Sequence, residues 1–168
     1  MYLAMNIRHL EAFDNADLAE IYSFPSVTEN TSQLPFLSAN SVTSLFSNSD
    51  HYTLVIENNA KVVGHLTLFL SPKARHKHCA GLAIAVHPEH HGKGIATKLM
   101  HEAINQADNW LNLVRLELQV HADNTAAIAL YQRMGFQLEG TKRLAAFKAG
   151  KYIDMLMMSR IRPDYETV

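Results

Sequence analysis

The chain has 168 residues, of which 48% are hydrophobic, and its 15 basic and 16 acidic residues leave a net charge of -1 at pH 7. This length and composition predict one globular domain over residues 1–168 with a sizeable core. The balanced charge excludes the basic footprint of a nucleic-acid-binding protein. No apolar run is long enough to cross a bilayer, and residues 1–5 lack the regions of a signal peptide. We therefore expect a cytoplasmic protein with neither nucleic acid nor membrane as a partner.

Cysteine and histidine usage bears on metal binding. The single cysteine, Cys79, excludes an internal disulfide and a cysteine-rich metal site. Five of the ten histidines are close in sequence, namely His76, His78, His87, His90 and His91. Their spacing matches no known zinc pattern. We expect solvated loop histidines and no metal.

The first half of the chain predicts a strand, two helices and a hairpin. In order, we expect a strand at residues 5–10, a helix at 17–22 capped by Asp14 or Asn15, a loop at 23–40, a short helix at 42–46, and strands at 52–57 and 61–70 joined at Asn58-Asn59.

The second half predicts strands and helices in alternation, followed by another hairpin. In order, we expect a polar turn at 72–77, a strand at 79–86, a helix at 92–109, a strand at 114–120, a helix between Asn124 and Gly135, and strands at 136–147 and 152–161. In the helix at 92–109, Ile95, Leu99 and Ala103 lie on one apolar stripe. In the strand at 114–120, Leu116, Leu118 and Val120 lie on one face. Strands in the middle with helices on both faces make a mixed α/β fold the consistent class.

The junction of the strand at 79–86 and the helix at 92–109 carries the strongest chemical signal. The first N–H groups of a helix have no partner within it, and the helix dipole adds positive potential at the same point. Gly92 and Gly94 remove side chains that would keep an anion away from the backbone, and Lys93 and Lys98 add positive charge. This pattern indicates a ligand with a diphosphate.

Three phosphate-binding loops were compared with this segment. A Walker loop needs Ser or Thr after Gly-Lys, but Gly94 follows Lys93, and His87 stands where its first glycine belongs. A dinucleotide fingerprint needs Gly or Ala where Thr97 stands. The run His91-Gly92-Lys93-Gly94-Ile95-Ala96 resembles the acetyl-CoA loop of the GNAT acetyltransferases, Gln/Arg-x-x-Gly-x-Gly/Ala, at all but the first position. Taken alone, Gly-Lys-Gly is also compatible with a plain turn before a helix.

A second motif follows the strand at 114–120. Asn124 suits a helix N-cap, Gly135 suits the left-handed position that ends a helix, and Phe136 can pack back on the last turn. The pattern Asn-x-x-Ala-x-x-x-Tyr-x-x-x-Gly-Phe, which includes Tyr131, resembles the second GNAT motif. The two motifs in this order make the resemblance quite specific, and it covers residues 52–161.

The GNAT resemblance implies a fold and a cofactor. The fold has a central mixed, mostly antiparallel sheet of about seven strands with helices on both faces. Its strands at 79–86 and 114–120 splay apart, and acetyl-CoA is the co-substrate. The resemblance assigns pantetheine contacts to Ile84, Ala85, Val86 and Asn124, the pyrophosphate to His91, Gly92, Lys93, Gly94, Ile95, Ala96 and Thr97, and the thioester sulfur to Tyr131. Homodimers are common in the family, so a homodimer is compatible with the resemblance.

The chemistry expected of these parts is direct acetyl transfer to an amine. The N–H of Val86 can stabilise the oxyanion, and Tyr131, with an ordinary pKa near 10, can act as general acid toward the departing sulfur. Tyr131 also fits a purely packing role, and Asn124 a purely capping one. The general base stays open among Glu117, His87, His121, Glu29 and a water chain. Cys79 lacks a paired base and is not expected to be a nucleophile.

The acceptor is expected to be a small amine. Short matches resemble bacterial GNAT enzymes that acetylate the α-amine of free amino acids; they are Asn30-Thr31-x-Gln33-x-Pro35, Val63-Gly64-His65-Leu66, Asp108-Asn109-Trp110-Leu111 and Gly150-x-Tyr152-x-Asp154. We expect Asn30, Thr31, Gln33 and Tyr152 to bind the acceptor, although the loop residues also suit local turns. The alternatives are a polyamine or antibiotic-amine acetyltransferase and a non-catalytic acyl-CoA-binding sensor.

Overall fold

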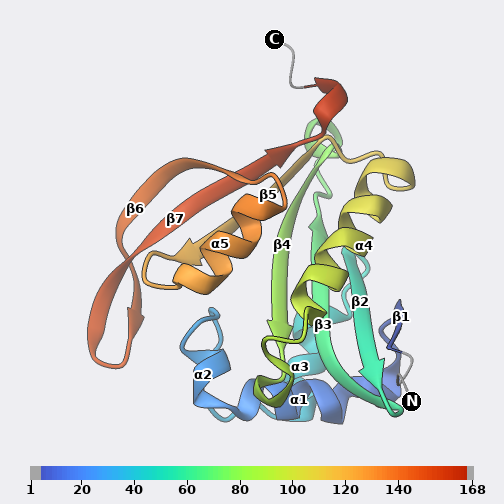
Figure 1. Cartoon of the computed structure of the whole chain (residues 1–168), viewed down its shortest axis with the longest axis vertical. Helices are drawn as coiled ribbons and strands as arrows, with labels where there is room; N and C mark the ends of the chain where they lie inside the picture. The colour runs from blue at the N-terminus through green and yellow to red at the C-terminus, as the bar shows by residue number, and fades with distance from the viewer. Residues whose placement is uncertain (1–4, 166–168) are drawn as a thin grey trace. The chain divides into compact units, whose positions relative to one another are not determined.

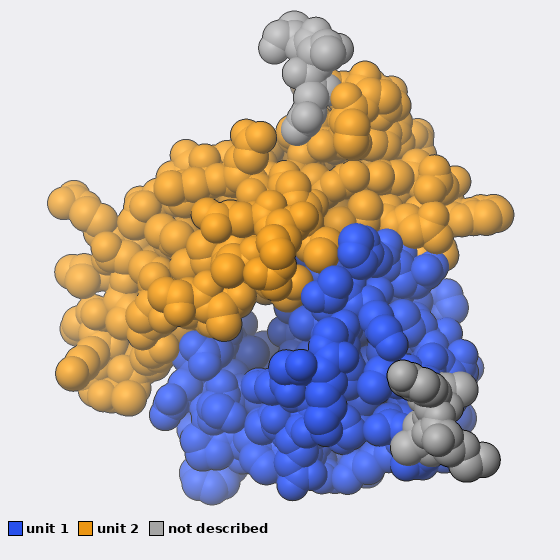
Figure 2. Space-filling model, viewed as in Figure 1, with its two compact units in different colours: residues 1–69, 83–103 blue, residues 70–82, 104–168 orange. Residues whose placement is uncertain are grey.

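A computed structural model describes residues 5–165 of the chain. The chain forms two compact units, coloured separately in Figure 2. Unit 1 contains residues 1–69 and 83–103, and unit 2 contains residues 70–82 and 104–168. The expectation of one domain over the whole chain stays a prediction.

The described residues form seven strands and five α-helices (Figure 1). The strands are β1 (Asn6–His9), β2 (His51–Asn58), β3 (Lys61–Leu70), β4 (Cys79–Val86), β5 (Arg115–His121), β6 (Gln137–Lys148) and β7 (Lys151–Ile161). The helices are α1 (Asn15–Ser23), α2 (Pro25–Thr28), α3 (Ala39–Phe46), α4 (Ile95–Asn109) and α5 (Thr125–Arg133). Short 3-10 helices are η1 (Ala12–Asp14), η2 (Ala74–His76), η3 (Pro88–His90) and η4 (Pro163–Tyr165).

One mixed sheet contains all seven strands, in the order β1-β2-β3-β4-β5-β7-β6. The pairs β1–β2, β2–β3, β5–β7 and β6–β7 are antiparallel, and β4–β5 is parallel. The β4–β5 ladder has three pairs, from Cys79↔Arg115 to Gly81↔Glu117, whereas the β5–β7 ladder continues to His121. Two strands that splay apart can pair only where they begin, and the short β4–β5 ladder has this form. The predicted fold class is confirmed.

The core of unit 1 forms where helices α1 and α3 pack on the sheet. Leu18 and Ile21 of α1 and Val42 of α3 are fully buried together with Val55 of β2, because their apolar side chains recur on one face of each element. α4 runs along β3 and the end of β4 (Figure 1). Its approach is close at Gly64, where an added Cβ would lie 3.3 Å from the Ala85 oxygen and from a methyl carbon of Ile95. Glycine at this position therefore sets how closely α4 packs.

Several boundaries predicted for unit 1 were wrong. Residues 23–40 are not all loop: Pro25, whose fixed φ suits a first helical position, opens α2, and Ser38 caps α3 by accepting a hydrogen bond from the Ser41 N–H at 3.1 Å. Asp14 does precede α1, but its carboxylate binds Arg8 and the Glu11 N–H instead of capping α1. The helix predicted from residue 92 begins at Ile95, because Gly92 and Gly94 have positive φ.

The β2–β3 hairpin turns one residue later than predicted. Asn59 and Ala60 both have positive φ, 53° and 59°, as a two-residue turn matching the strand twist requires. The expected asparagine pair at 58–59 therefore contributes only its second member to the turn.

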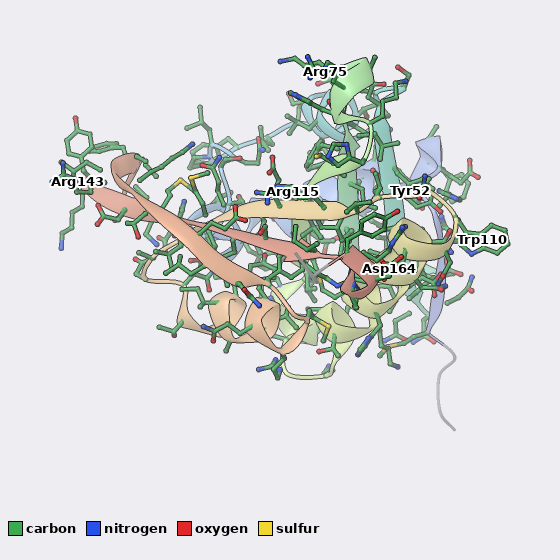
Figure 3. The ribbon with its side chains drawn as sticks, turned by 90° about the horizontal axis from the view of Figure 1, so that it is seen from above. Tyr52, Arg75, Trp110, Arg115, Arg143 and Asp164 are labelled. Carbon is green, nitrogen blue, oxygen red and sulfur yellow. The ribbon has the colours of Figure 1, made fainter. Side chains whose placement is uncertain are left out.

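Unit 2 is built from β5, α5 and the long β6–β7 hairpin, which turns at Ala149 and Gly150. The predicted alternation in β5 is confirmed, since Leu116, Leu118 and Val120 are buried. On the other face, Arg115 binds Glu117 at 2.9 Å and Glu139 at 2.6 Å; Figure 3 shows Arg115 beside these strands. The hydrogen bonds that Arg115 and Ser159 donate lower the pKa of Glu139 to about 2. This polar face ties β5 to β6.

Candidate active site

The end of β4 holds the loop that follows it through backbone contacts. The His87 N–H donates to the Val63 oxygen of β3 at 2.8 Å, so it points to the β3 edge of β4. Successive N–H groups of a strand point to opposite edges, so the Val86 N–H points to the other one. The Val86 carbonyl accepts a hydrogen bond from His91 Nε2 at 2.8 Å. Since a carbonyl only accepts, Nε2 of His91 carries the proton, and the imidazole fastens the loop to the strand.

Two of the three residues in the loop from Gly92 to Gly94 have no side chain. Both glycines have positive φ, +71° and +75°, and a Cβ added to either would meet no atom within 4 Å. The Lys98 N–H donates to the Gly94 oxygen at 3.0 Å, which makes Gly94 the N-cap residue of α4. The N–H groups of Ile95, Ala96 and Thr97 therefore precede the first hydrogen bond within the helix. Such a helix start, open and positive, is a binding site for phosphate oxygens.

Both ring nitrogens of His87, which precedes the glycine loop in the sequence, have polar partners. Its Nδ1 accepts from the Glu89 N–H at 3.2 Å, and its Nε2 lies 3.3 Å from Glu20 Oε1. The ring is 4% exposed. A histidine whose two nitrogens both take part in hydrogen bonds has no free lone pair to accept a proton from the substrate amine. This geometry disfavours His87 as the general base.

α5 of unit 2 carries the second motif as predicted. Asn124 Oδ1 accepts from the Ala127 N–H at 3.3 Å, so Asn124 is the N-cap residue. The Gly135 φ is +88°, and the Phe136 N–H donates to the Tyr131 oxygen at 3.0 Å. Capping uses only the oxygen of the Asn124 amide and leaves its two N–H donors for a ligand. Capping and ligand binding are thus compatible in one side chain.

Tyr131 is buried at the C-terminal end of α5. Its side chain is 8% exposed, and its ring centroid lies 5.9 Å from that of Phe136. Burial raises the pKa of Tyr131 to about 12. The phenol therefore keeps its proton throughout the neutral range. Tyr131 follows Asn124 by seven residues, two helical turns, so both lie on one face of α5.

The remaining candidates for the base differ in environment. Glu117 is half exposed and paired with Arg115, Glu29 is exposed at the end of α2, and His121 is 5% exposed. Burial and the nearby Glu117 carboxylate raise the pKa of Cys79, as expected of a thiol that is not a nucleophile. The base itself stays open among these residues and water.

The predicted acceptor residues make local contacts. Asn30 donates to the Ser26 oxygen at 2.9 Å, and Thr31 donates to the Thr28 oxygen at 3.4 Å. The Gln33 amide contacts a neighbour in sequence, with Nε2 3.4 Å from the Ser32 hydroxyl. Tyr152 stands on the β6–β7 hairpin with its ring centroid 5.0 Å from that of Phe147. Turn capping therefore describes Asn30 and Thr31 as observed, while Gln33 is half-buried and Tyr152 is exposed.

Two polar features of unit 1 were missed by the sequence analysis. Glu20 of α1 reaches His87, and Tyr22 binds His65 through a 2.7 Å contact between its hydroxyl and Nε2. Neither pair can be recognised in a single sequence, because Glu20 and His87 are 67 residues apart and Tyr22 and His65 are 43 residues apart. In residues 5–165, no three His, Cys, Asp or Glu side chains are grouped so as to hold a metal ion. Of the helices there, none combines the length and apolar character that a membrane crossing needs.

Comparison with known proteins extends these observations. The model of the Acetyltransferase (GNAT) family matches residues 15–136. L-amino acid N-acetyltransferase AaaT of Escherichia coli (strain K12) is 36% identical over 157 residues, which cover 93% of this chain and 97% of that protein. Spermidine N(1)-acetyltransferase of Vibrio cholerae is 35% identical over 86 residues, about half of each chain. The crystal structure of a GNAT acetyltransferase from Streptococcus pneumoniae superposes with a TM-score of 0.81 at 27% identity, covering 95% of this chain and 100% of that one.

Proposed function

Because this chain belongs to the GNAT family and is an acetyl-CoA-dependent N-acetyltransferase, we propose that it acetylates the primary amine of a free amino acid. The observation that carries the acetyl-CoA part of the proposal is the Gly92–Gly94 loop at the start of α4, which leaves three helix N–H groups for a pyrophosphate. The reaction is direct attack by the amine on the thioester, with both substrates bound.

In this proposal the cofactor is held mainly by backbone. Residues 91–97 bind the pyrophosphate, with Lys93 and Lys98 adding positive charge at an exposed helix start. The β4 backbone at Ile84, Ala85 and Val86 binds the pantetheine arm, together with the amide N–H groups of Asn124. The Asn124 oxygen already caps α5, and this supports a donor role for the other end of the amide.

The chemical step needs an oxyanion donor and a partner for the leaving sulfur. We assign the Val86 N–H to the oxyanion, because it points away from β3 and the β4–β5 ladder ends at Gly81. We assign the Tyr131 hydroxyl to the sulfur. With its pKa near 12, Tyr131 holds its proton more tightly than a thiol of pKa about 8.5 does. The phenol therefore acts chiefly by donating a hydrogen bond to the thiolate as it departs.

The amino-acid acceptor rests on similarity over the whole chain. The amino acid acetyltransferase matches 93% of this chain, whereas the spermidine acetyltransferase matches about half. A polyamine site needs several carboxylates to bind its ammonium groups, and residues 25–40 contain only Glu29. The amides of Asn30 and Gln33 and the Tyr152 hydroxyl can instead bind a carboxylate. Polyamine or antibiotic-amine acetylation and acyl-CoA sensing are the alternatives.

The test is a paired comparison of kcat/KM for an amino acid and its decarboxylated amine. A site that binds a carboxylate by hydrogen bonds rejects an analogue that lacks it, because the site's own polar groups then stay unpaired. We expect the amino acid to react far better, and Gln33→Ala to narrow the difference. Preference for spermidine or for the decarboxylated amine would replace the amino-acid assignment with the polyamine one.

A further inference from the structure

His87 stands between helix α1 and the glycine loop, and its contacts reach both. On one side, its Nε2 contacts Glu20 of α1, and its ring lies edge-on to Phe24 with centroids 4.7 Å apart. On the other side, its Nδ1 accepts from the Glu89 N–H and so caps η3, the short helix that leads to His91. Each contact lies within unit 1.

These contacts define one arrangement of the imidazole. Because Nδ1 accepts a hydrogen bond from a backbone N–H, it carries no proton, and Nε2 must carry the proton of the neutral ring. Nε2 therefore donates to Glu20 Oε1. The carboxylate fixes both the tautomer and the ring orientation, as an acidic partner does for histidines that ligate metals. Losing Glu20 would free the ring to rotate and uncap η3.

The geometry of the loop depends on this cap. η3 ends at His90, and the next residue, His91, is fastened to the Val86 carbonyl. Gly92 and Gly94 follow with positive φ. Glycine adopts positive and negative φ about equally readily, so it has no intrinsic preference for the observed conformation. Since the glycines do not hold themselves in place, their neighbours must do so: the Lys98 N–H holds the Gly94 carbonyl on one side, and the residues before the loop hold the other. Two contacts hold the chain before the glycines: the His87 side chain caps η3, and the His91 side chain donates to the Val86 carbonyl.

We infer that Glu20 and His87 are positioning residues for acetyl-CoA: Glu20 orients His87, and His87 holds η3 so that the loop at residues 92–94 is preorganised for the pyrophosphate. This inference rests on the proposed role of residues 91–97. It also connects the cofactor loop with the acceptor side, because Phe24, which packs on His87, adjoins the segment 25–40 that contains the proposed acceptor residues. Neither side chain need touch acetyl-CoA for its loss to weaken binding.

The chain offers a matched control in Lys61. This lysine forms an ion pair with the same Glu20 carboxylate at 2.7 Å, but both side chains are more than 40% exposed. Exposed pairs of this kind contribute little. Lys61→Met removes a charge next to Glu20 and leaves the contact between Glu20 and His87 in place.

The experiment measures the Kd of acetyl-CoA by calorimetry, and kcat at saturating acetyl-CoA, in four variants. We expect His87→Phe to raise the Kd about tenfold, equivalent to 1.4 kcal/mol, with kcat changed less than about twofold. We expect Glu20→Met to raise the Kd severalfold and Lys61→Met to leave it within about twofold. Because Glu20 acts through His87, the Glu20→Met/His87→Phe double variant should bind no more weakly than His87→Phe alone.

Three results would overturn the inference. They are an unchanged Kd in His87→Phe, additive effects in the double variant, and a loss of affinity in Lys61→Met equal to that in Glu20→Met. If His87→Phe does not fold, judged by its thermal unfolding, His87→Gln replaces it, with the same expectation of a raised Kd. The proposed cofactor site is tested separately: Gly94→Glu must abolish binding, and if it does while His87→Phe binds normally, only the positioning role fails.

Discussion

Acid should destabilise this protein through His65, a histidine that is completely buried. The side chain is completely buried in β3, with Nε2 2.7 Å from the Tyr22 hydroxyl and Nδ1 3.4 Å from the Thr67 hydroxyl. Burial lowers the pKa of His65 to about 3. In the unfolded chain the same group titrates at its ordinary value, near 6.5.

The sign and size of the effect follow from proton linkage. Between pH 6.5 and 3 the unfolded chain binds a proton that the folded chain does not, so stability falls as the pH falls. From these two pKa values, His65 alone removes about 2 kcal/mol of unfolding free energy between pH 7 and pH 5, and about 5 kcal/mol when titration is complete. Groups that are exposed in both states contribute little to this difference.

The assay is urea unfolding at pH 7 and at pH 5, for the wild type and for His65→Gln, which cannot titrate but can still bond to Tyr22. Circular dichroism is the suitable signal, because Trp110 is 75% exposed and points away from the ribbon (Figure 3). We expect the variant to lose about 2 kcal/mol less than the wild type between the two pH values. His101→Gln, an exposed histidine of α4, should behave like the wild type. An equal loss in His65→Gln would refute the reasoning.

The remaining predictions concern the proposed cofactor and catalytic residues. Acetyl-CoA at 100 times its Kd should stabilise the wild type by about 2.7 kcal/mol. Gly94→Glu should abolish the thermal shift and Gly94→Ala should only reduce it; a full shift in Gly94→Glu would exclude this loop. Tyr131→Phe should lower kcat by about 10²- to 10³-fold, as when one hydrogen-bond donor to a developing negative charge is removed, with little change in acetyl-CoA affinity. Because the pKa of Tyr131 is about 12, the wild-type rate should show no loss from phenol ionisation below about pH 10. Wild-type turnover in the variant would mean that Tyr131 only packs. Asn124→Asp keeps the cap and loses the N–H donors, so weaker acetyl-CoA binding at unchanged Tm supports a ligand role, and unchanged binding a purely capping one.

Local patterns carried most of the fold, and they failed where tertiary contacts decide. The β4 bounds at residues 79–86 and the Asn124 cap were predicted from the sequence, because an apolar run and a cap are properties of neighbouring residues. α2 was missed because four residues leave almost no periodicity. The start of α4 was placed three residues early, because the sequence alone does not show that Gly92 and Gly94 have positive φ instead of helical φ.

The candidate site divides in the same way. The glycine loop and the Tyr131 motif could be predicted, since each is one short stretch of sequence. The partners of His87 could not, because Glu20 comes from another element 67 residues away. The sequence left His87 open as a general base; the structure instead shows a ring with both nitrogens engaged. Only the fold shows that difference.

A site made from backbone explains why the cofactor signature is short while the acceptor is hard to predict. A pyrophosphate bound by helix N–H groups constrains the sequence only where side chains would intrude, at Gly92 and Gly94. All other loop positions can vary, which fits a first position occupied by His91 where Gln or Arg is usual. In the proposed function the acceptor is recognised by side chains, such as those of Asn30 and Gln33, on a segment whose observed hydrogen bonds are local. The acceptor class is therefore decided by experiment, where sequence patterns do not decide it. The measurement is kcat/KM for an amino acid and for its decarboxylated amine, in the wild type and in Gln33→Ala.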